Sequence, residues 1–430
     1  MVSLFKNTSF ITFCLAQLLS RFGDGLTTIA ILYIIGTASQ DPLLIGFVLF
    51  CQYSPMILFG LFAGSIADRF KKHFVMIGAD LYRAVILILM VFTVQYPYAL
   101  IVLVFLSGVG SALFYPARSS FVPIVAGEKY ISEAMAVSQS IYSIMQIAGP
   151  GFAGILLMFL SPSYLLVIDA ATYFFSALFI SVTVVTLKKQ QLEHTENPLA
   201  IKPLSSSIKE GVQVILKTAP LSFLILLLAQ VMFAAGIFNT TSNSLLLHIF
   251  QVPGFHFGMI EAVAGIGAVI GAMMGPLLLR YLKPGYLLLV TTVLMGIWML
   301  TVIPLERVEE WAGLLPVYLW VLGIGLMNAF LNVPISSLFL GLTPSEYRGR
   351  AMAMLQMSSN FGLVMGILIA GLLSKYFGVV LITALSGGLL VLVSLFTIKM
   401  KGYKALLSIE KKPSNMAQLR TKRKSHIKME

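Results

Sequence analysis

Long apolar stretches constrain the fold of this chain more than any other feature. Each is long enough to cross the roughly 30 Å hydrocarbon core of a bilayer as a helix. Because a backbone in lipid must satisfy its own hydrogen bonds, the stretches are predicted to be helices. Twelve of them recur, at about 9–36, 42–67, 74–95, 98–117, 134–160, 164–187, 219–243, 257–280, 285–304, 313–340, 351–374 and 378–398. We therefore predict an all-α integral membrane protein.

The composition supports this class. Hydrophobic residues make up 58% of the chain and charged residues only 11%, whereas a soluble protein carries about 25% charged residues. Soluble folds are therefore excluded. The first stretch has no small-residue cleavage site behind it and is expected to be a retained helix. Cys14 and Cys51 both lie in apolar stretches and are expected to be small buried residues, with no disulfide or metal site.

The distribution of basic residues predicts the orientation. With the N-terminus placed inside, 26 of the 29 lysines and arginines fall on the inner side. Only Arg307 and Lys375 fall outside, and Arg21 lies within the first stretch. This asymmetry predicts cytoplasmic N- and C-termini in a bacterial plasma membrane. It also explains the net charge of +12, so we expect no nucleic-acid partner.

The chain divides into two halves of six stretches. The predicted boundaries are an N-terminal half 1–187, a polar cytosolic linker 188–217, a C-terminal half 218–399 and a basic cytosolic tail 400–430. An internal repeat supports this division, because residues 133–156 and 350–373 align without a gap and are identical at eight of 24 positions. The tail is expected to be disordered and to touch anionic lipid.

The loop between the second and third stretches carries a charged motif, Gly64-x-x-x-Asp68-Arg69-x-x-Lys72. It resembles the signature loop of the major facilitator superfamily, although Lys71 replaces the second glycine of that pattern. The resemblance implies the major facilitator fold, with twelve helices in two six-helix pseudo-repeats, and a transport function. Gly64 is expected to allow close helix approach.

The same resemblance implies a gate. The Asp68 carboxylate would face the positive N-terminus of the helix that starts near Arg348, Gly349 and Arg350, and this contact would latch the outward-open state. A plainer interpretation is that the charges only mark a cytosolic loop. The segment Phe114–Arg118, which is predicted to end the fourth stretch, resembles another cytosolic gate element of the same exporters.

The fifth stretch contains Gly149-Pro150-x-x-Ala153-Gly154. This segment resembles the Gly-Pro-x-x-Gly-Gly element of drug/proton antiporters, with Ala153 in place of one glycine. The resemblance implies export. The alternative is ordinary packing of small residues between membrane helices.

Ionisable residues within the stretches are costly in a membrane and suggest function. Arg21 and Asp24 share a helix face, and they form either a structural pair or a proton-coupling carboxylate tuned by an arginine. Glu261 is a second proton-coupling candidate. Asp169 is expected to be a solvated pore or boundary group. A local or gate network is predicted for Asp80 and Arg83.

The sequence most resembles the macrolide-efflux and enterobactin-exporter group of drug:proton antiporters. The resemblance implies alternating access and export of a small amphipathic compound by a monomer, with membrane lipids as surroundings and the proton gradient in place of a cofactor. A lipid or lysolipid translocator and a non-transporting sensor are the alternatives. Because ATP-binding, metalloprotease and cysteine-cluster motifs are missing from the sequence, we expect no enzyme activity.

Overall fold

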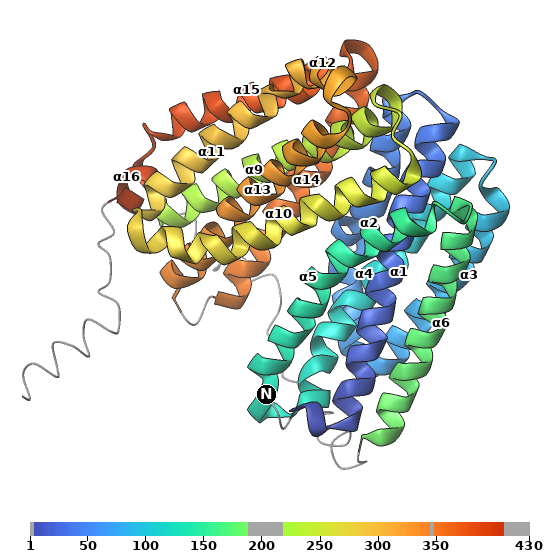
Figure 1. The fold of residues 1–430 in the computed structure, drawn as a ribbon. Coiled ribbons are helices and arrows are strands. Elements are labelled where there is room, and N and C mark those ends of the chain that lie inside the picture. Colours follow the sequence, from blue (N-terminus) through green and yellow to red (C-terminus); the bar gives the residue numbers. More distant parts are fainter. Residues whose placement is uncertain (1–3, 188–217, 345–347, 408–430) are drawn as a thin grey trace, which may run out of the picture.

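A computed structural model of the chain describes residues 4–187, 218–344 and 348–407, and this part is almost wholly helical with no β-strand. The first bundle consists of η1 (Leu4–Lys6), α1 (Thr8–Ala38), α2 (Pro42–Arg69), α3 (Lys72–Thr93), α4 (Pro97–Ala126), η2 (Glu128–Tyr130), α5 (Ile131–Leu156) and α6 (Pro162–Thr186). The second consists of α9 (Ala219–Ser244), the π-helical η3 (Leu245–Ile249), α10 (Gly254–Tyr281), α11 (Pro284–Leu300), α12 (Val302–Ala312), α13 (Leu315–Leu342), α14 (Arg348–Phe377), α15 (Val379–Thr397) and α16 (Lys401–Leu407). Figure 1 shows the two bundles side by side.

The predicted all-helical membrane fold is confirmed. Ten helices in the described part are long and apolar enough to cross a membrane, and the bent pair α11–α12 makes eleven. The remaining long helix is α5, whose apolar character is reduced by polar residues such as Gln139 and Gln146. Twelve spans are therefore consistent with the structure.

Two predicted helix ends and the predicted tail differ most from the structure. The fourth stretch was predicted to end at residue 117, but α4 continues to Ala126 with Pro116 and Pro123 inside it, because membrane helices tolerate prolines. The ninth ends at Leu300, where the chain bends by 53° into α12. In the tail, which was expected to be disordered, Lys401–Leu407 forms α16 and buries Tyr403 and Leu406. The linker 188–217 and the tail from 408 lie outside the described residues.

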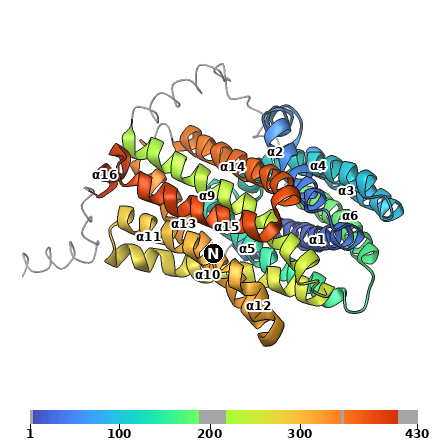
Figure 2. The same cartoon turned by 90° about the horizontal axis from the view of Figure 1, so that it is seen from above.

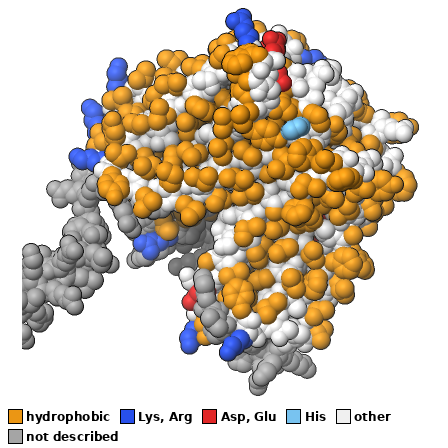
Figure 3. All heavy atoms as spheres, in the orientation of Figure 1, with side chains coloured by type: hydrophobic (Ala, Val, Ile, Leu, Met, Phe, Trp, Pro, Cys, Tyr) orange, Lys and Arg blue, Asp and Glu red, His pale blue; other side chains and the backbone are white. Residues whose placement is uncertain are grey.

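The two bundles have a common polarity. We call the end that carries most of the basic residues, such as Arg69, Lys129, Arg348 and Lys399, the basic end, and the opposite one the far end. Hydrophobic side chains cover the face between them in Figure 3, and charged side chains lie mainly at the edges of that face. This distribution suits a protein embedded in lipid.

The hydrophobic core indicates where the bundles meet. The largest cluster joins residues of both bundles, including Leu26, Ile45, Leu246 and Phe257, toward the far end. Toward the basic end the core divides into one cluster for each bundle. The bundles therefore pack together at the far end and diverge toward the basic end, as the ribbons in Figure 1 show. Seen from above in Figure 2, α14 of the second bundle lies beside α2 of the first.

Two glycine contacts close the far end. A Cβ on Gly258 of α10 would lie 2.5 Å from Gly154 N of α5, and one on Gly46 of α2 would lie 2.9 Å from Gly371 Cα of α14. Gly154 and Gly371 are equivalent positions in the internal repeat, so the two crossings are related by the pseudo-symmetry of the halves. Beside the second crossing, Lys375 Nζ donates to Asp41 Oδ2 at 2.8 Å.

Candidate functional site

A network of ionisable side chains lies inside the first bundle, between α1, α3 and α6. Arg21 Nη1 lies 3.4 Å from Asp24 Oδ2, and Arg83 Nη1 lies 3.6 Å from Asp24 Oδ1. Arg83 also forms an ion pair with Asp80, one helical turn earlier on α3. Two arginines and two carboxylates thus balance one another in charge. The predicted Arg21–Asp24 pair and the predicted local network of Asp80 and Arg83 are both present.

Hydroxyl groups and aromatic rings complete this network. Ser176 of α6 donates to Asp80 Oδ2 at 2.7 Å, and the Tyr173 hydroxyl donates to Asp24 Oδ1 at 2.5 Å. The guanidinium of Arg83 lies 4.1 Å from the ring centroid of Tyr173. Arg83 and Asp80 are almost completely buried, whereas Asp24 keeps 27% of its side chain exposed. Asp24 is therefore the most exposed of the four charged members of the network.

Asp169 is the residue that sequence reasoning misjudged. It was expected to be solvated, but it is completely buried. Thr27 of α1 donates to its Oδ2 at 2.5 Å and Thr172 donates to its Oδ1 at 2.8 Å. No lysine or arginine of the described part lies within 4.0 Å of it. A Cβ on Gly23 would lie only 1.8 Å from Asp169 Oδ1, so this glycine provides the space for the carboxyl group.

Two side-chain hydrogen bonds of the described part connect α1 to α4. Arg21 Nη1 donates to the Tyr115 hydroxyl at 2.5 Å, and Arg118 Nη1 donates to Gln17 Oε1 at 3.1 Å. Tyr142 of α5 also packs on Arg21, with its ring centroid 5.0 Å from the guanidinium carbon. Arg118 had been assigned to a gate element at the end of the helix. Because α4 continues past it, Arg118 instead lies two turns inside the helix.

Glu261, the other predicted coupling residue, lies about two turns into α10 from the far end, beside the contact with α5. A Cβ on Gly151 of α5 would lie 3.4 Å from the Cβ of Ala262, the next residue on α10. The side chain of Glu261 is partly buried. No ion pair joins it to another residue of the described part, so it is a second membrane carboxylate without a cation.

The Gly-Pro motif of α5 packs against both bundles. Gly149 contacts Gly25 of α1, because a Cβ on Gly149 would lie 2.9 Å from Gly25 Cα. Ala153 is buried, and Gly154 contacts Gly258 of α10. Pro150 O lies 2.5 Å from the position of a Cβ on Gly258. The motif thus makes the small-residue packing contacts that were its alternative interpretation, at the interface between the bundles.

The predicted gate is not formed by the residues whose contacts can be described. No neighbouring atom lies within 4 Å of a Cβ on Gly64, so the close helix approach expected there is absent from this conformation. Arg69 is exposed and Lys72 half-buried. Arg348 Nε donates to Thr343 O at 3.3 Å. The side chains of Asp68 and Arg350 lie outside the described part, and Gly349 lies in the first turn of α14, so the latch stays a prediction.

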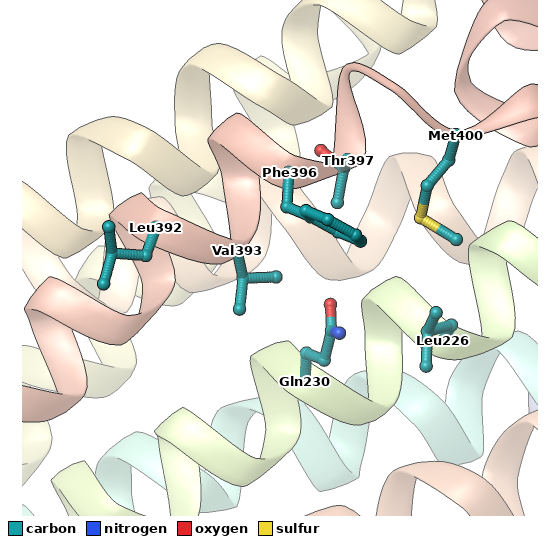
Figure 4. A pocket seen from close by; sticks show the side chains of 7 residues that line it. All are labelled: Leu226, Gln230, Leu392, Val393, Phe396, Thr397 and Met400. Atoms are coloured by element: carbon teal, nitrogen blue, oxygen red, sulfur yellow. The ribbon is translucent and has the colours of Figure 1, made fainter.

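One cavity of about 360 Å³ lies away from the charged network, between α9 and α15. Figure 4 shows Gln230 pointing into it from α9, opposite Val393 and Phe396 of α15. The lining is apolar apart from Gln230 and Thr397. Because no ionisable group lines it, this cavity offers no means of coupling to protons.

Comparisons with known proteins agree with the architecture. The profile of the transmembrane secretion effector family matches residues 2–425. The uncharacterized MFS-type transporter YfiS of Bacillus subtilis is 27% identical over 92% of this chain and 94% of its own. Macrolide efflux protein A of Streptococcus pyogenes is 24% identical over 90% and 94%, and the staphyloferrin A transporter of Staphylococcus aureus is 22% identical over 88% and 91%.

Solved structures share the fold. The nucleoside transporter NupG superposes with a TM-score of 0.73 at 14% identity, covering 94% of this chain and 100% of that one. A bacterial homologue of the iron transporter ferroportin, in an inward-facing state, gives a TM-score of 0.71 at 13% identity, covering 90% and 98%. The chain therefore belongs to the transmembrane secretion effector family of the major facilitator superfamily, and it is a multi-pass membrane transporter.

Proposed function

We propose that the chain exports a small amphipathic compound in exchange for protons. The observation that carries this proposal is the environment of Asp169, a buried carboxyl held by two threonines and no cation. An ionised carboxylate without a partner is costly in a medium of low dielectric. Asp169 would therefore hold a proton in this conformation and release it when the bundles rearrange. Asp24, between two arginines, is the exposed neighbour that would relay it.

Alternating access is the proposed mechanism. Basic loops favour the cytosolic side of a membrane, so the basic end is proposed to face the cytosol, together with both termini. The conformation described above would then be closed to the outside and open to the cytosol. Rocking of the two halves about a site near the midplane would expose that site to each side in turn.

The latch proposed for the opposite state joins Asp68 to the N-terminus of α14. It would form only when the basic ends approach each other, which agrees with the open space beside Gly64 here. Asp68→Ala is expected to reduce transport strongly while leaving membrane insertion unchanged. Flux equal to that of the wild type would contradict the gate assignment, and Glu310→Ala, at an exposed position of α12, is the control that removes the same charge.

The direction and substrate are inferred from the relatives and from α5. Macrolide efflux protein A is named for efflux, and the Gly-Pro motif of α5 resembles that of antiporters. A macrolide-like or siderophore-like compound is therefore proposed, carried by a monomer that uses the proton gradient and no cofactor. A lipid translocator or a non-transporting sensor would be the alternative.

Proton movement in proteoliposomes tests the proposal. A pH-sensitive dye inside the vesicles would report substrate-driven proton flux for a panel of macrolides, dyes and siderophores. Two variants, Asp169→Asn and Glu261→Gln, each remove a carboxylate that has no cationic partner. A third, Asp24→Asn, removes the carboxylate that is paired with arginines. Flux that is lost in Asp169→Asn, with substrate binding retained, is the expected result. Flux that survives all three changes, or silence of a folded wild type across the panel, would contradict proton-coupled export.

A further inference from the structure

Arg118 differs from the other membrane arginines of the first bundle because it has no carboxylate partner. Its Nη1 donates to the Gln17 amide oxygen, which is neutral. Asp24, on the same helix as Gln17, is already shared by Arg21 and Arg83. Within the described part, no carboxylate lies within 4.0 Å of Arg118. A guanidinium in this position normally has a counter-charge.

The surroundings of Arg118 offer hydrogen-bond donors and a second cation. Gln17 is 2% exposed and its amide nitrogen has no acceptor, and Arg118 Nε is likewise buried without an acceptor. Arg21 follows Gln17 by one helical turn on α1, and Tyr115 precedes Arg118 by one turn on α4. The two hydrogen bonds between α1 and α4 therefore lie on adjacent helical turns, which places the guanidiniums of Arg21 and Arg118 roughly one turn apart. Unused donors beside a cation without a counter-charge form a site for an oxyanion.

Arg118 and its neighbours lie beside the segment of α5 that does not contact the second bundle. The contact of α5 with α10 runs from Gly154 to Ile147, where a Cβ on Gly265 would lie 2.7 Å from Ile147 Cγ1. Beyond that point, toward the basic end, Gln146 and Gln139 are exposed. Gln146 donates to the hydroxyl of Tyr142, whose ring packs on Arg21. Aromatic and amide groups thus adjoin the cations on one side.

We propose that Arg118 and Gln17 bind the carboxylate of an amphipathic anion, whose aromatic or apolar body lies against Tyr115 and Tyr142. This inference rests on the proposed transport function and names the charge of its substrate. A guanidinium binds a carboxylate through two parallel hydrogen bonds. Arg21 is occupied by Asp24 and the two tyrosines, so it holds the site in place while Arg118 supplies the free charge.

Equilibrium binding of two matched probes tests the inference. 1-Pyrenebutyrate and 1-pyrenebutylamine share a pyrene body and carry opposite charges. With the full chain in nanodiscs, pyrene fluorescence is expected to report tighter binding of the butyrate. Loss of one charged hydrogen-bonded contact should weaken butyrate binding roughly tenfold to a hundredfold in Arg118→Gln, and amine binding should not weaken. Lys129→Gln, which removes an exposed charge near the same end of α4, is the matched control.

A second variant keeps the test decisive if Arg118→Gln fails to fold. Gln17→Glu would give Arg118 an internal carboxylate, so butyrate should lose its advantage while the helix contact is retained. Arg118→Lys should keep part of the preference. Equal or tighter binding of the amine by the wild type, or no binding of the butyrate, would overturn the inference, as would butyrate affinity that is unchanged in both Arg118→Gln and Gln17→Glu.

These measurements need neither flux nor coupling, so they separate the two proposals. A chain that binds butyrate through Arg118 but moves no protons keeps the anion site and loses antiport. A chain that exports pyrenebutylamine against protons, with no effect of Arg118→Gln, keeps antiport and loses the anion site.

Discussion

Arg83 of α3 lies between two carboxylates, with its Nη1 3.6 Å from Asp24 Oδ1 and its Nη2 paired with Asp80. Its side chain is 1% exposed. This single guanidinium therefore compensates charges on α1 and α3 and, through Tyr173, reaches α6. The first bundle depends on it for the electrostatic balance of its interior.

Replacement of Arg83 by methionine should destabilise the protein severely. Breaking a buried ion pair from one side leaves an uncompensated charge and costs about 3–5 kcal/mol. The double variant Arg83→Met with Asp80→Asn should recover much of this loss, because Asp24 keeps Arg21. Thermal unfolding in detergent measures both, with exposed Arg69→Met as control. A single variant as stable as the wild type would contradict the proposed balance.

Gly23 should tolerate no side chain. A Cβ there would lie 1.8 Å from Asp169 Oδ1 and 2.2 Å from Thr172 Oγ1. Gly23→Ala should displace the carboxyl and lower stability by about 1–3 kcal/mol, and Asp169→Ala in the same chain should relieve the clash with the carboxyl while the contact with Thr172 remains. Gly78→Ala on α3, where no neighbour lies within 4 Å, should be neutral or slightly stabilising. If thermal unfolding does not separate the two glycine variants, the space assigned to Gly23 is wrong.

Ion pairs that depend only on spacing along one helix could be predicted from the sequence. Arg21 and Asp24 are three residues apart, so their pairing follows from helix geometry alone. Asp80 and Arg83 repeat the same spacing. The long apolar stretches and the basic loops predicted the helices in the same way, because length and charge act locally.

Contacts between helices escaped prediction. The burial of Asp169 depends on Thr27 and on the absence of a side chain at Gly23, both on α1, and no spacing in the sequence relates α1 to α6. Arg118 was placed at a helix end because the fourth apolar stretch was predicted to stop at residue 117, yet the helix continues. The motif around Gly154 was recognised, but its partner Gly258 was not, since either glycine alone is common in a membrane helix.

The pair Asp41–Lys375 at the far end should be insensitive to mild acid. Burial opposes ionisation of Asp41, but hydrogen bonds from Lys375 and from the Leu43 N–H hold the pKa of this carboxyl below its usual value. A lowered folded pKa stabilises the closed end fully above the pKa of a free aspartate, about 3.9. That stability is lost only as the pH falls through the lower value.

Thermal unfolding of wild type and Asp41→Asn across pH measures this contribution. The difference between the two should stay constant from pH 8 to pH 5 and disappear only in stronger acid. It should also be small, because an exposed ion pair contributes little and is screened by salt. A difference that already disappears between pH 7 and pH 5 would show that another group controls the far end.

Gly258 should decide whether the far end can close. A Cβ there would lie 2.5 Å from both Gly154 N and Pro150 O, and these backbone atoms cannot move aside as a side-chain tip can. Gly258→Ala should therefore destabilise the closed far end by about 1–3 kcal/mol and shift the population toward the state open at that end.

A cysteine at Leu247, 5% exposed here, reports this opening through its reaction with an impermeant maleimide, in a background with Cys14→Ser and Cys51→Ser. The labelling rate should rise in Gly258→Ala and stay unchanged in Gly275→Ala, where the nearest atom lies at 3.9 Å. Equal rates in the two variants would mean that the α5–α10 crossing does not hold the bundles together.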